Sequence, residues 1–372
     1  MHELLAIHSV PNMGSQRMRL ILEHYAWDAV SAWADRRNWG GVSGLSRDIA
    51  ALLISGAAKL DVDAIFEQFF RSGAKLLTLQ DAAYPPLLRE IHEAPPLLFY
   101  KGVLPKPDNL CLAMVGSRRF TNYGREVANL LSRDLARQGL WIVSGLARGI
   151  DSFCHSGALE AGGKTIAFVG SGIDICYPRE NQKLEQKIIE NGAVISELPV
   201  GSPPVAQNFP MRNRLISGIS KGVVVVEAGE KSGTLRTVDF ALSQGRDVFV
   251  VPGPITSPMS KGTNQLIKEG MCPITCAEDV LQHYPVQPAL FPLETLDLRE
   301  KTPHPLDRAE DGPTNVEKQI LEMTIMPLHF DDMVKTLAMP PHELAARLTV
   351  LEVRGMIRQL PGNYYQKRSQ RL

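Results

Sequence analysis

Between Leu110 and His283, short apolar segments alternate with longer amphipathic ones, and this alternation limits the fold more than any other feature of the chain. Strand-length and helix-length segments in this order are typical of a parallel sheet with helices on both faces. The run Val223–Val226 is apolar at every position, as expected of a strand buried on both faces. We predict strands at 110–115, 141–144, 165–169, 193–196, 222–227 and 247–251, and helices at 124–138, 150–161, 181–191, 213–220 and 234–244.

Three further regions surround this α/β domain, to which we assign residues 98–283. Residues 1–97 are predicted to be helical, and their turn 11–14 (Pro-Asn-Met-Gly) is similar to SAM-like or helix–hairpin–helix modules; a small packing domain would give the same pattern. Prolines interrupt 284–313, which we interpret as a linker. Residues 314–372 show three helical patterns and a β-hairpin, the order of a winged-helix domain. Their basic tail is typical either of a solvated terminus or of a surface that binds DNA or a partner.

The composition excludes several classes of protein. The chain has 372 residues with 40 basic and 40 acidic ones, so only local charge placement can indicate a nucleic-acid ligand. Five cysteines form no paired framework, and no cluster of further ligands surrounds Cys272 and Cys276. The first residues lack the pattern of a signal peptide, and no apolar run has the length of a membrane helix. We therefore expect a cytoplasmic protein without a membrane partner, a metal or a cofactor.

Glycines, hydroxyl groups and cations gather in the segments that follow the predicted strands. Loops after parallel strands meet at one edge of the sheet, and backbone N–H groups, hydroxyls and cations together suit phosphate. Lys231–Thr234 is the strongest single candidate, because it starts a helix after the most apolar strand. For Asn181 a helix cap is the plainer interpretation, and for Asp151 a structural role, either holding its loop or pairing with Arg148. The predicted DNA- or phosphate-binding residues are Gly116, Ser117, Arg118, Arg119, Ser144, Gly145, Arg148, Arg179, Asn181, Arg212, Asn213, Arg214, Lys231, Ser232, Gly233 and Thr234.

Two nucleotide-binding motifs do not fit. The loop VGSR at 115–118 lacks the glycine spacing of a dinucleotide-binding fingerprint. Gly163-Lys164-Thr165 resembles the end of a P-loop, but a predicted helix precedes it and a predicted strand follows, the reverse of the order that a P-loop requires. We expect neither NAD binding nor nucleotide hydrolysis at these segments.

The runs GSRRFTNYG, SGLARGID, GSGIDICYPREN, FPMRNRLISGIS and VVVVEAGEKSGTLRT, within about 98–281, resemble in their order the DNA processing protein A family (DprA, also called Smf). The resemblance implies an extended Rossmann-like fold that binds single-stranded DNA and is not an enzyme. It also implies a homodimer that loads the RecA recombinase onto incoming DNA, past single-strand-binding protein, in natural transformation. The family's phosphate contacts would fall on Arg118 and Lys231, with Arg148, Arg179, Arg212 and Arg214 lining the same basic pocket.

Such a pocket would bind the DNA backbone more than the bases. Arginine forks grip sugar-phosphate without reading sequence. Few aromatic residues near the loops are available for stacking on bases, namely Phe120, Tyr123, Tyr177 and Phe209. We therefore expect salt-sensitive binding with little sequence preference.

The main alternative is an enzyme on the same α/β core. Nucleotide phosphoribohydrolases resemble this core and carry a PGGxGTxxE segment whose glutamate acts in catalysis, whereas Thr237 occupies that position here. A threonine cannot replace a carboxylate in acid–base catalysis, and Asp239 would face another side of the helix. These differences favour binding over hydrolysis. A transcription regulator whose winged helix reads duplex DNA is the third interpretation, and sequence-specific duplex affinity would identify it.

Overall fold

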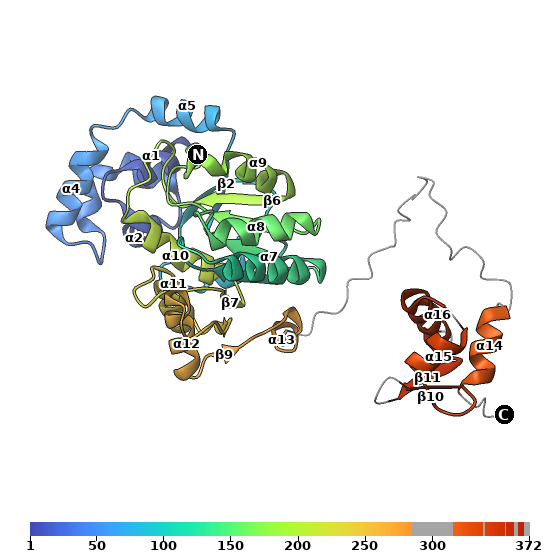
Figure 1. Ribbon diagram of the computed structural model, residues 1–372. Helices are drawn as coiled ribbons and strands as arrows, with labels where there is room; N and C mark the ends of the chain where they lie inside the picture. The colour runs from blue at the N-terminus through green and yellow to red at the C-terminus, as the bar shows by residue number, and fades with distance from the viewer. Residues whose placement is uncertain (285–314, 338, 354, 361–363, 368–372) are drawn as a thin grey trace. The chain divides into compact units, whose positions relative to one another are not determined.

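The computed structural model of the protein describes residues 1–284, 315–337, 339–353, 355–360 and 364–367. The chain forms two compact units, Met1–Leu290 and Phe291–Leu372 (Figure 1). Apart from Tyr284, the predicted linker 284–313 lies outside the described residues. Among the helices of the described part, none combines the length and the apolar character needed to cross a membrane.

The larger unit is built on one sheet. Its strands within the described residues are β1 (Lys75–Thr78), β2 (Leu97–Gly102), β3 (Cys111–Val115), β4 (Trp141–Ser144), β5 (Thr165–Phe168), β6 (Gly192–Ser196), β7 (Gly222–Val225), β8 (Asp247–Val250) and β9 (Cys272–Pro273). Their order across the sheet is β1-β2-β6-β5-β4-β3-β7-β8-β9. Neighbours from β6 to β9 are parallel, whereas β2 is antiparallel to both β1 and β6. The predicted parallel-sheet α/β fold is confirmed.

Helices cover both faces of this sheet (Figure 1). They are α6 (Pro86–Arg89), α7 (Asn122–Arg137), α8 (Ile150–Glu160), α9 (Gln182–Asn191), α10 (Asn208–Ile219), α11 (Thr234–Ser243), α12 (Lys261–Lys268) and α13 (Ala277–Leu281), with 3-10 turns η2 (Arg179–Asn181) and η3 (Pro258–Ser260). In β7, Val223 and Val225 face one hydrophobic layer and Val224 the other. Helices α10 to α12 supply the first layer, and α7 and α8 the second. Both faces of β7 are therefore buried, as its unbroken apolar run predicts.

The first 73 residues form a helical module on the sheet. It comprises α1 (His2–Ser9), α2 (Gly14–His24), α3 (Ala29–Ala34), η1 (Arg36–Gly41), α4 (Arg47–Ala57) and α5 (Val62–Ser72). The start of α5 is capped by the Asp61 carboxylate, which accepts from the Ala64 N–H at 3.0 Å, and α5 ends at Gly73 with a φ of +66°. Strand β1 follows directly, so the module ends well before the predicted boundary at residue 97. A four-residue edge strand is too short to show a period of two against its helical surroundings.

The smaller unit has the elements of a winged helix. It consists, in the described residues, of α14 (Asn315–Met323), α15 (Phe330–Leu337), α16 (Pro341–Val353), β10 (Leu328–His329), β11 (Ile357–Leu360) and β12 (Tyr364–Lys367). Its strand order is β10-β12-β11, all antiparallel. Residues from all three helices and from β11 share one hydrophobic core. The predicted winged helix is confirmed, and β10 is an addition that its two residues could not reveal. Arg354, Arg368 and Arg371 of the predicted basic tail lie outside the described residues.

A buried histidine makes the larger unit sensitive to acid. The His155 ring lies with Nδ1 2.7 Å from the Thr165 hydroxyl, which itself donates to the Ile142 carbonyl. Burial lowers the pKa of His155 to about 3, against 6.5 in an exposed chain. Below pH 6.5 the unfolded chain therefore binds a proton that the folded chain does not, and stability falls by up to about 1.4 kcal/mol per pH unit.

We expect a His155→Asn variant, which keeps a donor toward Thr165 but does not titrate, to lose less stability between pH 6.5 and 4 than the wild type. Urea denaturation at a series of pH values measures this slope. Equal slopes for the two proteins would contradict the prediction.

Candidate functional site

A hollow of about 530 Å³ opens where β3 and β7 end. The chain leaves β3 toward β4, β5 and β6 on one side and later crosses to β7 on the other, so the strand order reverses between β3 and β7. Loops diverge at such a point and leave a crevice at the carboxyl ends of the strands. Nine of the sequence-predicted residues line the hollow: Gly116, Ser117, Arg118, Arg119, Arg212, Asn213, Ser232, Gly233 and Thr234.

The loop after β3 forms the first wall and is fixed by Glu227. The buried Glu227 carboxylate accepts from the Thr121 N–H at 3.0 Å and from the Thr121 hydroxyl at 2.5 Å. The Ser117 N–H donates to the Glu227 carbonyl at 2.8 Å. Both ends of the loop are thus tied to the segment after β7. Arg118 and Arg119 lie between these ties, exposed and facing the hollow.

An arginine and two aromatic rings form a platform at the hollow. The Arg118 guanidinium carbon lies 5.3 Å from the centre of the Phe209 ring, and the Tyr177 ring centre lies 5.4 Å from the same centre. Phe209 in turn packs close to Gly170, where a Cβ would lie 3.0 Å from the ring. Arginine over an aromatic face is stabilised by the ring quadrupole. The two rings are inclined at 45° to each other, and the platform thus offers aromatic surface directly beside a guanidinium whose geometry suits a phosphate.

Arg212 provides a buried positive charge at the base of the hollow. Its guanidinium donates to the Gly145 carbonyl at 2.7 Å and to the Phe168 carbonyl, and the side chain is 5% exposed. A Cβ at Gly145 would lie 2.6 Å from this guanidinium, which explains the glycine. Burial lowers the pKa of Arg212 to about 10, although the negative charge of Asp151 acts in the other direction and raises it. Burial likewise raises the pKa of the Asp151 carboxyl, and Arg212 opposes that rise. At neutral pH Arg212 remains charged.

The start of α11 forms another wall. The Ser232 hydroxyl accepts from the Thr234 N–H at 3.2 Å and donates to the Thr234 hydroxyl at 2.9 Å. The next two N–H groups, of Leu235 and Arg236, donate to the Ser232 carbonyl at 3.1 Å and the Gly233 carbonyl at 3.3 Å. This turn therefore suits an anion through the positive end of the helix dipole and its hydroxyl groups. Thr237, one turn further along α11, is buried and also lines the hollow. Lys231 is exposed beside this turn but does not line the hollow.

Six further predicted residues do not line the hollow, namely Ser144, Gly145, Arg148, Arg179, Asn181 and Arg214. The buried Asn181 amide donates to the Leu146 carbonyl and the Ser152 hydroxyl, both at 2.9 Å, so this residue fixes loops and its side chain caps no helix. The exposed Arg148 pairs with Glu180 at 2.7 Å.

Ser144 and Asp151 also have partners other than a ligand. The buried Ser144 hydroxyl donates to the Met114 carbonyl at 2.7 Å. Of the two contacts expected for Asp151, the structure shows the one that holds its loop, a hydrogen bond with the Ala147 backbone. Its charged neighbour is Arg212 rather than Arg148. Of the remaining predicted residues, Arg179 is exposed and Gly145 makes room for Arg212.

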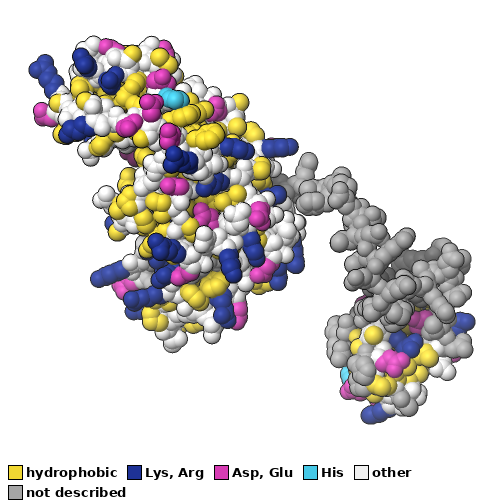
Figure 2. All heavy atoms as spheres, turned by 90° about the horizontal axis from the view of Figure 1, so that it is seen from above, with side chains coloured by type: hydrophobic (Ala, Val, Ile, Leu, Met, Phe, Trp, Pro, Cys, Tyr) yellow, Lys and Arg dark blue, Asp and Glu magenta, His cyan; other side chains and the backbone are white. Residues whose placement is uncertain are grey.

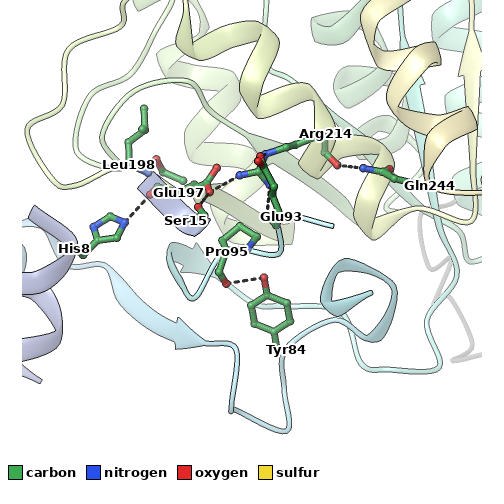
Figure 3. A network of polar contacts seen from close by, with 10 residues as sticks. His8, Ser15, Tyr84, Glu93, Pro95, Glu197, Leu198, Arg214 and Gln244 are labelled. Atoms are coloured by element: carbon green, nitrogen blue, oxygen red, sulfur yellow. Dashed lines mark hydrogen bonds and ion pairs between the residues drawn. The ribbon is translucent and has the colours of Figure 1, made fainter. Parts of the chain in front are cut away.

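Arg214 is the clearest correction to the sequence prediction. Helix α10 begins at Asn208, five residues before the predicted start. At 100° per residue, Arg212 and Arg214 point about 200° apart around the helix, so only one of them can face the hollow. Arg214 is buried on the other side, where it donates to the Glu93 carbonyl at 2.8 Å and to the Glu197 carboxylate (Figure 3).

Sequence reasoning missed part of the lining. Pro204 and Ala206, from the loop before α10, contribute to the wall beside Phe209. Neither residue type carries a signal for phosphate or for bases. Their role depends only on the path of the loop.

The positive charge of the site is local. Lys and Arg side chains are interspersed with Asp and Glu and with hydrophobic residues on the face of the larger unit shown in Figure 2. This mixture agrees with the balanced composition of 40 basic and 40 acidic residues. Any anion selectivity therefore depends on the few cations at the hollow.

Comparison with known proteins agrees with this architecture. Residues 75–285 match the family model "DNA recombination-mediator protein A", and residues 304–363 match "DprA winged helix domain". The chain belongs to the DprA/Smf family. It is 39% identical to Protein Smf of Escherichia coli (strain K12) over 79% of this chain and 77% of that protein. With DNA processing protein DprA of Streptococcus pneumoniae (strain ATCC BAA-255 / R6), identity is 43% over 56% of this chain and 73% of that protein.

Solved structures of DprA proteins share the fold. The X-ray structure of DprA from Streptococcus pneumoniae superposes with a TM-score of 0.68 at 34% identity, covering 76% of this chain and 97% of the other. A structure of Helicobacter pylori DprA, which concerns its single-stranded DNA binding mode, gives a TM-score of 0.51 at 30% identity, covering 57% and 96%. The family-model boundary at residue 75 coincides with the start of β1.

Proposed function

We propose that this DprA-family protein is a single-stranded DNA-binding recombination mediator. The observation that carries the proposal is the Arg118–Phe209–Tyr177 platform beside the first turn of α11, within one hollow. The guanidinium and the positive end of the α11 dipole suit a phosphate, and the rings suit an unstacked base. Bases of a duplex are stacked and paired, so the platform favours a single strand.

Binding of this kind depends on the DNA backbone. A hollow of about 530 Å³ is of the size that encloses a small ligand, so only a short part of a strand fits inside. The hollow offers cations, hydroxyls and backbone groups rather than a set of side chains matched to one base. Affinity should therefore fall steeply with salt and vary little with sequence.

Membership of the DprA/Smf family supports a proposal for the partners of the protein. We propose that it acts as a homodimer in the cytoplasm and loads the RecA recombinase onto incoming strands, past single-strand-binding protein, during natural transformation. The related Helicobacter pylori protein, studied for single-stranded DNA binding, supports the choice of ligand. Two hollows in a dimer would bind long strands better than short ones, through their effective concentration.

We further propose that the hollow binds DNA without catalysing hydrolysis. Thr237 lines the hollow at the position where a nucleotide phosphoribohydrolase would carry its glutamate. Asp151 is the carboxylate among the lining residues of the described chain, and its burial beside Arg212 gives it a structural partner. A hydrolase would need an acid or base free to reach the ligand.

A salt titration tests the proposed function. We expect fluorescence anisotropy to show tight binding to a labelled single-stranded oligonucleotide, weaker binding to the matched duplex, and a linear fall of the logarithm of affinity with the logarithm of salt concentration. The same preparation should release no base from nucleoside monophosphates. Weak DNA binding with released base would show that the hollow is an enzyme site.

A further inference from the structure

An ion pair joins the two ends of a segment that forms one wall of the hollow. This segment runs from Glu197, after β6, to Arg214 in the second turn of α10, and Figure 3 shows the two side chains pointing toward each other. The ion pair between them is largely buried, with 7% of the Arg214 side chain and 17% of the Glu197 side chain exposed. Between the two residues lie Pro204, Ala206 and Phe209, which line the hollow. The position of this wall therefore depends on where Glu197 lies.

The helical module binds the same glutamate from the other side. The Ser15 hydroxyl donates to the Glu197 carboxylate oxygen that also accepts from Arg214. His8 lies with Nε2 2.9 Å from the Glu197 carbonyl, and Figure 3 shows both side chains directed toward Glu197. His8 is near the end of α1 and Ser15 in the first turn of α2, on either side of the turn 11–14. The turn singled out in the sequence thus places two polar groups on one residue of the α/β domain.

Helix α10 transmits this contact to the hollow. Its Arg212 face is attached to the ends of β4 and β5 through the Gly145 and Phe168 carbonyls. Its Arg214 face is attached to Glu93 and Glu197. A helix fixed on both sides cannot rotate without breaking one of the two attachments. A displacement of Glu197 would therefore move Phe209, which lies on the first turn of α10, relative to Arg118.

We infer that Ser15 and His8 are positioning residues through which the helical module sets the geometry of the DNA-binding wall, by holding Glu197 against Arg214. This inference rests on the proposed function, since it concerns the regulation of the same site. It gives the helical module a role in DNA affinity without any contact of its own with DNA.

Full-length Ser15→Ala, Glu197→Leu, which removes both oxygen acceptors, and the double variant test the inference by anisotropy with a labelled oligothymidylate. Loss of one hydrogen bond should weaken binding of Ser15→Ala about three- to tenfold. The slope of affinity against salt should stay unchanged, because no phosphate contact is removed. If Ser15 acts through Glu197, adding Ser15→Ala to Glu197→Leu should cause no further loss. Ser15→Thr, which keeps the hydroxyl, should restore affinity.

Ser31→Ala is the matched control. Like Ser15, Ser31 is a serine of the helical module whose hydroxyl donates to a carboxylate. Its acceptor is Asp28 of the same module, at 2.5 Å, and not Glu197. We expect this variant to bind DNA as the wild type does. If the wild type binds and Ser15→Ala binds equally well, or if the losses in the double variant add, the inference is overturned alone. A wild type that does not bind the oligonucleotide overturns the proposed function and this inference with it.

Discussion

Replacing Arg118 with glutamate is expected to weaken single-stranded DNA binding by about 100-fold. The change removes a charge-assisted contact with phosphate and adds a like charge, together about 3 kcal/mol. It also removes the cation from the face of the Phe209 ring, 5.3 Å away. The slope of affinity against salt should fall by about one unit, because one phosphate contact is lost. Thermal unfolding should change little, since Arg118 is exposed.

Arg137→Glu is the control for this charge reversal. Arg137 lies in the last turn of α7, which runs antiparallel to the strands and ends at the opposite edge of the sheet from the hollow. Its side chain is 57% exposed, and its contact with Asp134 is a surface ion pair at 3.4 Å. The two variants carry the same net charge. If Arg137→Glu weakened binding as much as Arg118→Glu, the effect would be one of overall charge, and the placement of DNA at the hollow would be wrong.

Replacing Arg214 with alanine is expected to lower the free energy of unfolding by about 3–5 kcal/mol. The change leaves the Glu197 carboxylate largely buried without its cation, and such an uncompensated charge costs far more than a lost surface contact. It also leaves the Glu93 carbonyl without its donor. Urea denaturation monitored by circular dichroism measures this loss as a lower midpoint.

An exposed ion pair in α5 serves as the control for Arg214→Ala. Arg71 contacts Glu67 at 2.9 Å, but their side chains are 78% and 66% exposed. Such a pair contributes about 0–1 kcal/mol, so Arg71→Ala should change stability little. Equal effects of the two variants would mean that Arg214 is not a structural residue. It would then be open again to the role in phosphate binding that the sequence suggested.

The strands of the α/β core could be predicted because a strand buried on both faces appears in the sequence as a short run of apolar residues. Strand β4 matches its predicted range, and β7 is apolar along its whole length. The shorter strands at the margins of the sheet show no such apolar run. Strand β9 has two residues and β1 has four, and both form only by pairing with a neighbour distant in sequence.

The candidate site was predicted in part. The loops after β3 and β7 were located correctly at the hollow, because glycine, hydroxyl and arginine residues after parallel strands mark the ligand edge of such a sheet. The same signal also selected Asn181 and Ser144, whose polar groups satisfy buried backbone carbonyls instead. A polar residue in a loop looks the same in the sequence whether its partner is a ligand or the protein.

By itself the sequence determined the α/β core, the winged helix and the edge of the sheet at which the hollow lies, since these depend on local patterns of burial and on loop chemistry. Only the tertiary structure decided which cations face the hollow. Arg212 and Arg214 are two residues apart, yet one lies at the hollow and the other pairs with Glu197. The physical reason is the rotation of the helix, about 200° over two residues, combined with partners brought close by folding alone.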